Sequence, residues 1–338
     1  MRTLAFTLAL ALLPAVPVHA QSAAAQPAVR NLRAELGPAE RALAAADYRA
    51  AHAAYARHAG RNPLAQFTLG LFEQQGWGRR PDPVAACAWF ERAAHGHIPA
   101  ARQFLGDCLA QGIGRAVDGP AAVQWYRKAA AAGLAWADCA AGTLYIEGKV
   151  VPKDLTQGLA LCTAAAQAES TPAMLRLADY YREGSQVPAN PRLARFWYGQ
   201  AAQRHHHEAQ LRLGVMLSEG AGGDADVAQA RFWLEHAAME GYAPAYLPTA
   251  ILYANAPVDP ATGALAPDDL AKIYMWNRAA RAGIAATGSD GSNNCSNCAA
   301  QLADIARIDA MVMAVMPPAW QPVLDRRVAD HLATFAAH

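Results

Sequence analysis

The feature that most constrains the fold of this chain is a repeat with a period of 36 residues. Small residues recur at this spacing, and a second small residue follows each of them after five positions. The first column is Ala65, Ala101, Ala137, Ala173, Ala209 and Ala245, and the second is Gly70, Gly106, Gly142, Ala178, Gly214 and Ala250. Repeats of roughly 20–45 residues stack along one direction, so this periodicity predicts a solenoid.

Each repeat is predicted to hold two helices, which we call helix A and helix B. In helix A, Ala65, Leu69, Phe72 and Gly76 follow one another on a single helical face. The glycine at the end can adopt the left-handed conformation that stops a helix. An Asp or Asn then offers the side-chain acceptor of an N-cap for helix B. These predicted caps are Asp82, Asp118, Asp154, Asn190, Asp226 and Asp269.

A bulky residue also recurs in helix B. It falls on the same stripe as packing alanines such as Ala86 and Ala93, so we expect it to be a core residue rather than part of a solvent-exposed aromatic ladder. The column is Trp89, Trp125, Leu161, Trp197, Trp233 and Trp276. A Gly-x-Gly at the end of helix A could suggest a phosphate loop. No predicted strand precedes it and no Gly-Lys-Ser/Thr follows, so we interpret it as a turn.

The combined pattern, A-x3-LG-x2-(Y/F)-x3-G-x-G and then D-x6-W-(Y/F)-x2-AA, resembles the Sel1-like repeat, a longer relative of the tetratricopeptide repeat. The resemblance covers residues 61–284 and is strongest over residues 101–133. It implies an all-α fold: a right-handed α-solenoid of about six antiparallel helix pairs with capping helices at both ends, and helix A on the concave side. It also implies a function as an adaptor for protein complexes.

Two repeats depart from this pattern. In the third repeat, Gln157-Gly158 and Leu161 replace the usual alanine and tryptophan positions. The sixth repeat has Pro248 inside helix A and an insertion at residues 257–266 where a short turn belongs. Because proline cannot donate a backbone hydrogen bond, we expect the sixth repeat to be distorted.

The two ends of the chain are expected to differ from the repeats. An apolar run that ends in small residues is typical of a secretory signal peptide, here residues 1–20. Residues 21–35 are expected to form a flexible leader and residues 36–60 an N-terminal capping helix. Residues 285–338 should hold a flexible loop, from Ala285 to Asn294, and C-terminal capping helices.

Charge and hydropathy limit the class of partner that the chain can bind and the cellular location that we expect for it. The chain has 29 Lys and Arg against 28 Asp and Glu, with a formal net charge of +1, and its basic residues are scattered. Nucleic-acid binders carry clustered basic residues, so no nucleic-acid partner is expected. The apolar leader is shorter than the ~20 residues that span a bilayer. We therefore expect a periplasmic or secreted protein without a transmembrane anchor, which binds another protein or an envelope polymer.

Six cysteines in an exported chain predict disulfides. In each predicted pair, one cysteine precedes a turn between two helices and the other follows that turn at about the same distance. Antiparallel packing of the two helices brings such positions side by side. The predicted pairs are Cys87 with Cys108 and Cys139 with Cys162. Cys295 and Cys298 lie in a segment rich in Gly, Ser and Asn, where they could close a local disulfide or form a redox pair. The chain lacks the βαβ pattern of thioredoxin-like proteins, which favours a local structural bond.

The sequence gives little support for an enzyme. Some exported proteins of the family that the repeats resemble are linked to β-lactams, so a β-lactamase or cell-wall hydrolase is the alternative function. No serine precedes a lysine by three residues, as a serine acyl enzyme of that type requires. His205-His206-His207-Glu208 is the strongest metal candidate. Because it falls in a predicted turn between repeats, we interpret it as surface histidines and predict no catalytic residue, metal or cofactor.

The candidate binding face comes from three columns of helix A, at three, six and ten residues beyond the alanine column. These columns vary where the core columns do not, and we expect them to lie opposite the core. Their polar members would then form one ridge of acidic character across neighbouring helices. The predicted residues are Asp107, Gln111, Glu147, Arg176, Asp179, Glu183, Arg212 and Glu219. The alternative is that this face is merely solvated.

Overall fold

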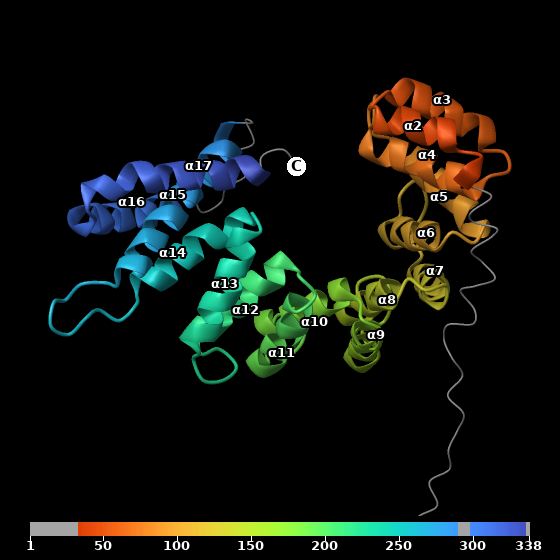
Figure 1. Ribbon diagram of the computed structural model, residues 1–338. Helices are drawn as coiled ribbons and strands as arrows, with labels where there is room; N and C mark the ends of the chain where they lie inside the picture. The colour runs from red at the N-terminus through yellow and green to blue at the C-terminus, as the bar shows by residue number, and fades with distance from the viewer. Residues whose placement is uncertain (1–32, 290–297, 336–338) are drawn as a thin grey trace, which may run out of the picture. The chain divides into compact units, whose positions relative to one another are not determined.

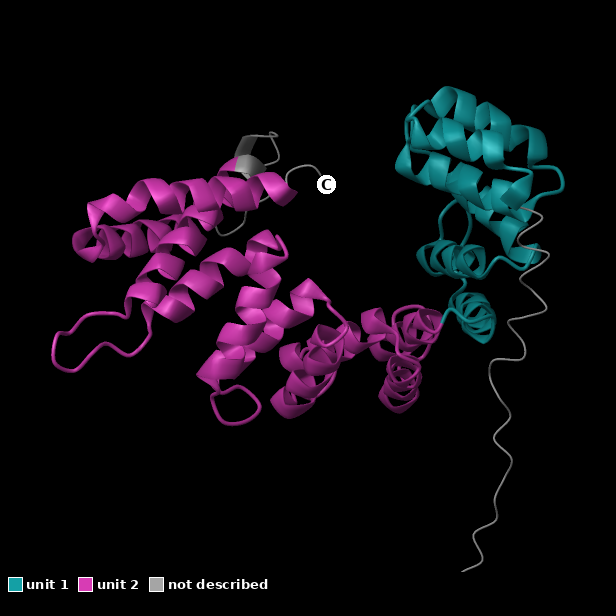
Figure 2. Ribbon diagram, in the orientation of Figure 1, with its two compact units in different colours: residues 1–134 teal, residues 135–338 magenta. Residues whose placement is uncertain are grey.

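The computed structural model describes residues 33–289 and 298–335 (Figure 1). The expected signal peptide, most of the expected leader and Cys295 lie outside the described residues. Within them every element is a helix, which confirms the predicted all-α fold. The chain divides into two compact units, residues 1–134 and 135–338 (Figure 2).

The first unit contains two capping helices and two repeats. Its helices are α2 (Gly37–Ala44), α3 (Tyr48–His58), α4 (Pro63–Gln75), α5 (Pro83–His95), α6 (Pro99–Gln111) and α7 (Gly119–Ala131). The pairs α4–α5 and α6–α7 each form a repeat, and α5 packs on α6. The N-terminal segment holds two helices where the sequence analysis expected one. The break follows from Ala46, which has a φ of 55°, and Asp47, which caps α3.

The second unit contains four repeats and the C-terminal helices. Its elements are α8 (Trp136–Glu147), α9 (Leu155–Gln167), α10 (Thr171–Glu183), α11 (Pro191–Ala202), α12 (His207–Glu219), α13 (Val227–Met239), η2 (Ala243–Ala245), α14 (Tyr246–Ala254), α15 (Pro267–Ser289), α16 (Cys298–Val315), η3 (Pro318–Trp320) and α17 (Gln321–Phe335). The pairs α8–α9, α10–α11, α12–α13 and α14–α15 form repeats three to six, and α9 packs on α10 as α11 packs on α12. This stacking is that of an α-solenoid.

The helix ends follow the sequence signals in five of the six repeats. Helix A ends at a left-handed glycine with a φ of 67–71°, as at Gly76 and Gly148. The predicted Asp or Asn caps helix B, and its side chain accepts a hydrogen bond of 2.9–3.2 Å from a backbone N–H three residues later. Asp269 is the exception, because α15 begins at Pro267. Asp269 therefore lies in the first turn of that helix and pairs with Arg231.

The residues of the alanine column are buried in the core, whereas most residues of the tryptophan column are only half-buried. All six alanines of the first column are 0% exposed. The fully buried position of helix B is the residue after the bulky one, such as Phe90 or Tyr198. Trp89, Trp125, Trp197 and Trp233 are only half-buried, and Trp276 alone is buried. Trp89, Trp197 and Trp233 nevertheless pack against the core clusters. The expected core position therefore holds in part for these three residues, and only Trp276 is buried as expected.

The sixth repeat is distorted, as expected. Its helix A begins as the 3-10 turn η2 and continues as α14, which has nine residues where most A helices have thirteen. The insertion forms an exposed loop, in which Asp259 accepts hydrogen bonds from the backbone N–H groups of Ala261 and Thr262. Helix α15 runs on to Ser289, so residues 285–289 are helical and not part of a loop.

Helices α16 and α17 cover the last repeat. Ile305, Ile308 and Val312 of α16 pack with Leu324 of α17 against Trp276 and its neighbours in one apolar cluster. This confirms that the C-terminal segment holds helices that close the array. Within the described ranges, no helix combines the length and the apolar character that crossing a bilayer requires.

Candidate binding surface

The eight predicted surface residues belong to both units. Asp107 and Gln111 lie on α6 in the first unit, whereas the other six lie on α8, α10 and α12 in the second unit. The columns also differ in exposure. The column ten residues beyond the alanine is exposed in all repeats but the third, whereas the column six residues beyond it is half-buried throughout. The column three residues beyond the alanine is also half-buried, except at Arg176. The expectation that all three columns lie opposite the core is therefore wrong for the middle column and holds for the first column only at Arg176.

The middle column is half-buried because it packs against helix B of the same repeat. The hydroxyl of Tyr126 donates a 2.6 Å hydrogen bond to Asp107. Tyr198 donates a 2.5 Å hydrogen bond to Asp179 in the same way. Both tyrosines are buried, and each stands 19 residues after its aspartate. These two carboxylates therefore satisfy buried hydroxyl groups, which is a structural role.

In neighbouring repeats, apolar residues occupy the two positions that the aspartate and the tyrosine occupy here. Where helix B carries Phe90 or Leu234 in place of tyrosine, the residue 19 positions earlier is Leu71 or Val215. An acid occurs at this position only where a tyrosine follows at that spacing. The sequence contained this signal, but it becomes readable only when columns of helix A are compared with columns of helix B.

Burial sets the protonation of these pairs. Burial raises the pKa of Asp107, and the hydrogen bond from Tyr126 opposes that shift. Burial also raises the pKa of Tyr126 and of Tyr198, and in both the neighbouring aspartate raises it further. At neutral pH both tyrosines therefore remain protonated donors.

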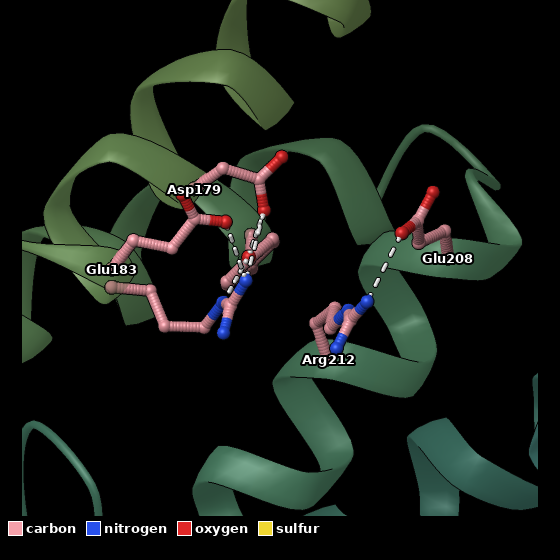
Figure 3. A network of polar contacts seen from close by, with 6 residues as sticks. Asp179, Glu183, Glu208 and Arg212 are labelled. Atoms are coloured by element: carbon pink, nitrogen blue, oxygen red, sulfur yellow. Dashed lines mark hydrogen bonds and ion pairs between the residues drawn. The ribbon is translucent and has the colours of Figure 1, made fainter. Parts of the chain in front are cut away.

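A network of charged groups surrounds Asp179 (Figure 3). Arg182 donates 3.0 Å hydrogen bonds to Tyr198 and to Glu183, and its guanidinium lies 3.8 Å from Asp179. On α12, Arg212 forms a 3.4 Å ion pair with Glu208 (Figure 3). Arginines and carboxylates alternate on these two helices, so the surface of α10 and α12 has mixed charge. The predicted acidic character does not hold for this part of the array.

Several predicted residues remain open to solvent. Arg176 is exposed and lies 6.0 Å from the ring of Trp136 and 5.9 Å from that of Tyr180. Gln111, Glu183 and Glu219 are exposed, while Glu147 is half-buried and pairs with Lys149 at 3.2 Å. These side chains are free of the structural role that Asp107 and Asp179 have.

A second, apolar surface lies on the B helices of the second unit. Phe196 on α11 is 51% exposed, and Phe232, one repeat later on α13, is 57% exposed. Each phenylalanine packs edge-on against the following tryptophan, with ring centroids 4.9 Å apart. This pair was not among the residues predicted from the sequence, because helix B was interpreted only as a source of core residues.

The cysteines of the repeats pair as predicted. Cys87 and Cys108 join α5 to α6, and thus two consecutive repeats, whereas Cys139 and Cys162 join the two helices of the third repeat. Cys298 is also disulfide-bonded. The predicted pairing of Cys298 with Cys295 stays a prediction, because Cys295 is not among the described residues.

Comparisons with known proteins agree with this architecture. The model of the Sel1 repeat matches residues 63–96, 99–134, 137–170, 171–206 and 207–242, so the matches end before the distorted sixth repeat. A Sel1 repeat protein from Oxalobacter formigenes is 26% identical, with a TM-score of 0.55 over 73% of this chain and 99% of its own. The protein c5321, a protective antigen of uropathogenic Escherichia coli strains with an SLR fold, is 22% identical, with a TM-score of 0.56 over 95% of this chain and 72% of its own. None of the curated proteins matches the chain.

Proposed function

The chain belongs to the Sel1 repeat family, and we propose that it is an exported scaffold that binds a partner protein along the A helices of its second unit. Sel1 repeats generally mediate interactions between proteins, and proteins built from them are typically scaffolds without enzymatic activity. The proposal adds a binding face and a compartment to that general role.

The observation that supports this face is a charge pattern that repeats from one A helix to the next. Arg176 and Arg212 occupy the same position of α10 and α12, and Glu183 and Glu219 share a second position. In each helix the two positions are seven residues apart, which is two turns and about 10.5 Å along one side. Neighbouring helices thus present the same pair of opposite charges.

This pattern favours a protein as the partner. A polyanion such as a nucleic acid is bound by a surface of one sign, whereas α10 and α12 offer both signs in alternation. A protein segment that carries acidic and basic side chains can pair with both, and such complementarity provides specificity. The two disulfides of the repeats support an oxidising compartment, since structural disulfides are rare in reducing ones. We therefore place the protein in the periplasm or outside the cell.

The exposed phenylalanines favour a second candidate surface for the same function. Phe196 and Phe232 recur at one repeat position, and aromatic side chains are enriched at interfaces between proteins. They lie on the B helices, so a partner bound there would rest on different side chains from those of the charged columns. An experiment can therefore separate the two surfaces.

The test uses the purified protein as bait for an extract of the cell envelope, followed by titration of the identified partner. We expect the charge reversals Arg176→Glu and Arg212→Glu, made together, to weaken the affinity by at least tenfold. The matched control reverses two exposed arginines of α17, Arg326 and Arg327, and should change the affinity by less than twofold. Arg212 is half-buried and pairs with Glu208, so the Tm of each double variant is measured beside its affinity. A loss of binding is assigned to the charged face only where the variant keeps the helical content and the Tm of the wild type.

Two outcomes would contradict the proposed face. If the double charge reversal binds like the wild type while Phe196→Ser with Phe232→Ser abolishes binding, the B helices hold the site. If neither double variant changes the affinity, the site lies outside these helices of the second unit.

A further inference from the structure

The histidine run at residues 205–207 meets two further metal-binding side chains in the folded chain. His205 lies in the turn between α11 and α12, while His236 and Glu240 lie at the C-terminal end of α13. One possible ligand atom from each of these three side chains lies within 4.8 Å of the other two. His205 and Glu240 are exposed and His236 is half-buried, so an ion can reach the group from solvent.

The distances around Glu240 are already close to those between ligands of one ion. Nδ1 of His236 lies 3.5 Å from Oε2 of Glu240, and Nδ1 of His207 lies 3.0 Å from the same oxygen. Both nitrogens are buried and neither makes a hydrogen bond, because the contacts lack the required alignment. Zinc bonds of about 2.0–2.2 Å in a tetrahedral site place neighbouring ligand atoms roughly 3.3–3.6 Å apart. Small side-chain rotations would therefore close the group around an ion.

The repeat itself provides an internal comparison. His97 and Glu169 occupy the position of His205 in two other repeats, and all three have a positive φ of 58–65°. The left-handed backbone is thus a property of the turn and not of the histidine. The residues that correspond to His236 and Glu240 differ, however, since they are Lys128 and Ala132 opposite His97. Of the turns that contain His97 and His205, only the turn that contains His205 faces a second imidazole and a carboxylate.

We propose that His205, His236 and Glu240 bind a divalent transition-metal ion, with zinc as the best match. Two imidazoles and one carboxylate form a donor set that zinc uses in proteins. His207 would hold the carboxylate of Glu240 in place, as partners of ligating carboxylates commonly do. The ion would join the turn before α12 to the end of α13. It would then hold parts of consecutive repeats together, as the Cys87–Cys108 disulfide does in the first unit.

The proposal is tested by calorimetric titration of the tag-free protein with zinc chloride. We expect one zinc ion per chain, and we expect His236→Ala and Glu240→Gln each to weaken the affinity by at least tenfold. His206→Ala is the matched control, because His206 belongs to the same run but not to the group, and it should bind within twofold of the wild type. A hundredfold excess of zinc over its Kd should also raise the Tm by roughly 5–10 °C, and a chelator should reverse the shift.

Two results would overturn this site. If His236→Ala and Glu240→Gln bind zinc like the wild type, the two residues are not ligands. If His206→Ala weakens binding as much as His205→Ala does, the run of histidines chelates zinc by itself. Should His236→Ala fail to fold, Glu240→Gln decides the question alone, because it is nearly isosteric and Glu240 is exposed.

Discussion

At the scale of single residues, hydrogen bonds decide which charged groups of helix A are available for a partner. Asp107 and Asp179 resemble surface carboxylates in the sequence, but each accepts a hydrogen bond from a buried tyrosine. A buried hydroxyl that loses its acceptor costs about 1–3 kcal/mol. Substitution of these aspartates therefore tests folding and not binding.

This distinction can be measured on α10. Asp179→Lys removes the acceptor of Tyr198, so we expect it to lower the free energy of unfolding by about 1–3 kcal/mol. Glu183→Lys, one turn further on the same helix, changes an exposed group and should alter it by about 0.5 kcal/mol or less. Urea denaturation of both variants measures the difference. Equal stabilities would show that the hydrogen bond to Tyr198 does not matter for folding.

The Asp107 carboxyl predicts a pH dependence. Because burial raises its pKa in the folded state, the folded chain holds this proton at a pH where the unfolded chain has lost it. The contribution of Asp107 to stability must then increase as the pH falls from neutral through the folded pKa, until it levels off below the ordinary value of 3.8. Asp107→Asn lacks this titration and is the reference.

We therefore expect the free energy of unfolding of the wild type to rise relative to that of Asp107→Asn as the pH is lowered. The other titratable groups are the same in both proteins, so their contributions cancel in the comparison. Denaturation of both proteins at neutral pH and at a pH close to 4 measures the difference. A constant difference, or one of opposite sign, would contradict the burial of this carboxyl as the dominant effect.

At the scale of helices, the third repeat is packed more closely than the others. The Cα atoms of Cys139 and Cys162 lie 3.9 Å apart, and a Cβ added to Gly158 would lie 2.7 Å from the carbonyl oxygen of Gly142. Alanine occupies the position of Gly158 in the four repeats with the regular pattern. The glycine that replaces the usual alanine at residue 158 thus allows α8 and α9 to approach each other this closely.

Gly158→Ala should therefore destabilise the protein although alanine is the usual residue at this position in the other repeats of the chain. We expect a loss of about 1–3 kcal/mol from overpacking. Gly199→Ala on α11 is the control, because a Cβ there meets nothing within 4 Å. It should stabilise the helix by about 0.5–1 kcal/mol through its better helix propensity. If both substitutions shift the Tm in the same direction, the close approach of α8 and α9 is not what requires Gly158.

The two disulfides join helices in different ways but close loops of similar length. The sequence separations are 21 residues for Cys87–Cys108 and 23 for Cys139–Cys162. A loop of about 20 residues corresponds to roughly 3 kcal/mol of stabilisation. We expect replacement of either pair by alanine to lower the Tm of its own unit by a similar amount. Calorimetry that found no change for one pair would show that its bond adds no stability.

Local signals could be read from the sequence, whereas contacts between helices could not, with the two disulfides of the repeats as the exception. The glycines that end helix A and the caps of helix B depend on a few neighbouring residues, so they were predicted correctly in five repeats. The half-burial of Trp89 depends on the rotation of α5 against α4, which periodicity alone does not determine. His236 and Glu240 lie more than 30 residues from His205, so only stacking of the repeats reveals that they meet.

At the scale of the whole molecule, both units are built from the same helix pair, yet their surfaces differ. In the second unit, A helices repeat a charge pair and B helices repeat an exposed phenylalanine. A scaffold gains its binding surface from such columns, because stacking places equivalent side chains side by side. The central claim is that the charged column of α10 and α12 contacts the partner.

Site-specific photo-crosslinking tests that claim most directly. A photoreactive amino acid is placed in turn at positions 176 and 219 in the charged column, at 196 and 232 on the B helices, and at 326 on α17. Our account predicts crosslinks to the partner from positions 176 and 219, and none from position 326. Crosslinks confined to positions 196 and 232, or an equal yield from position 326, would contradict it.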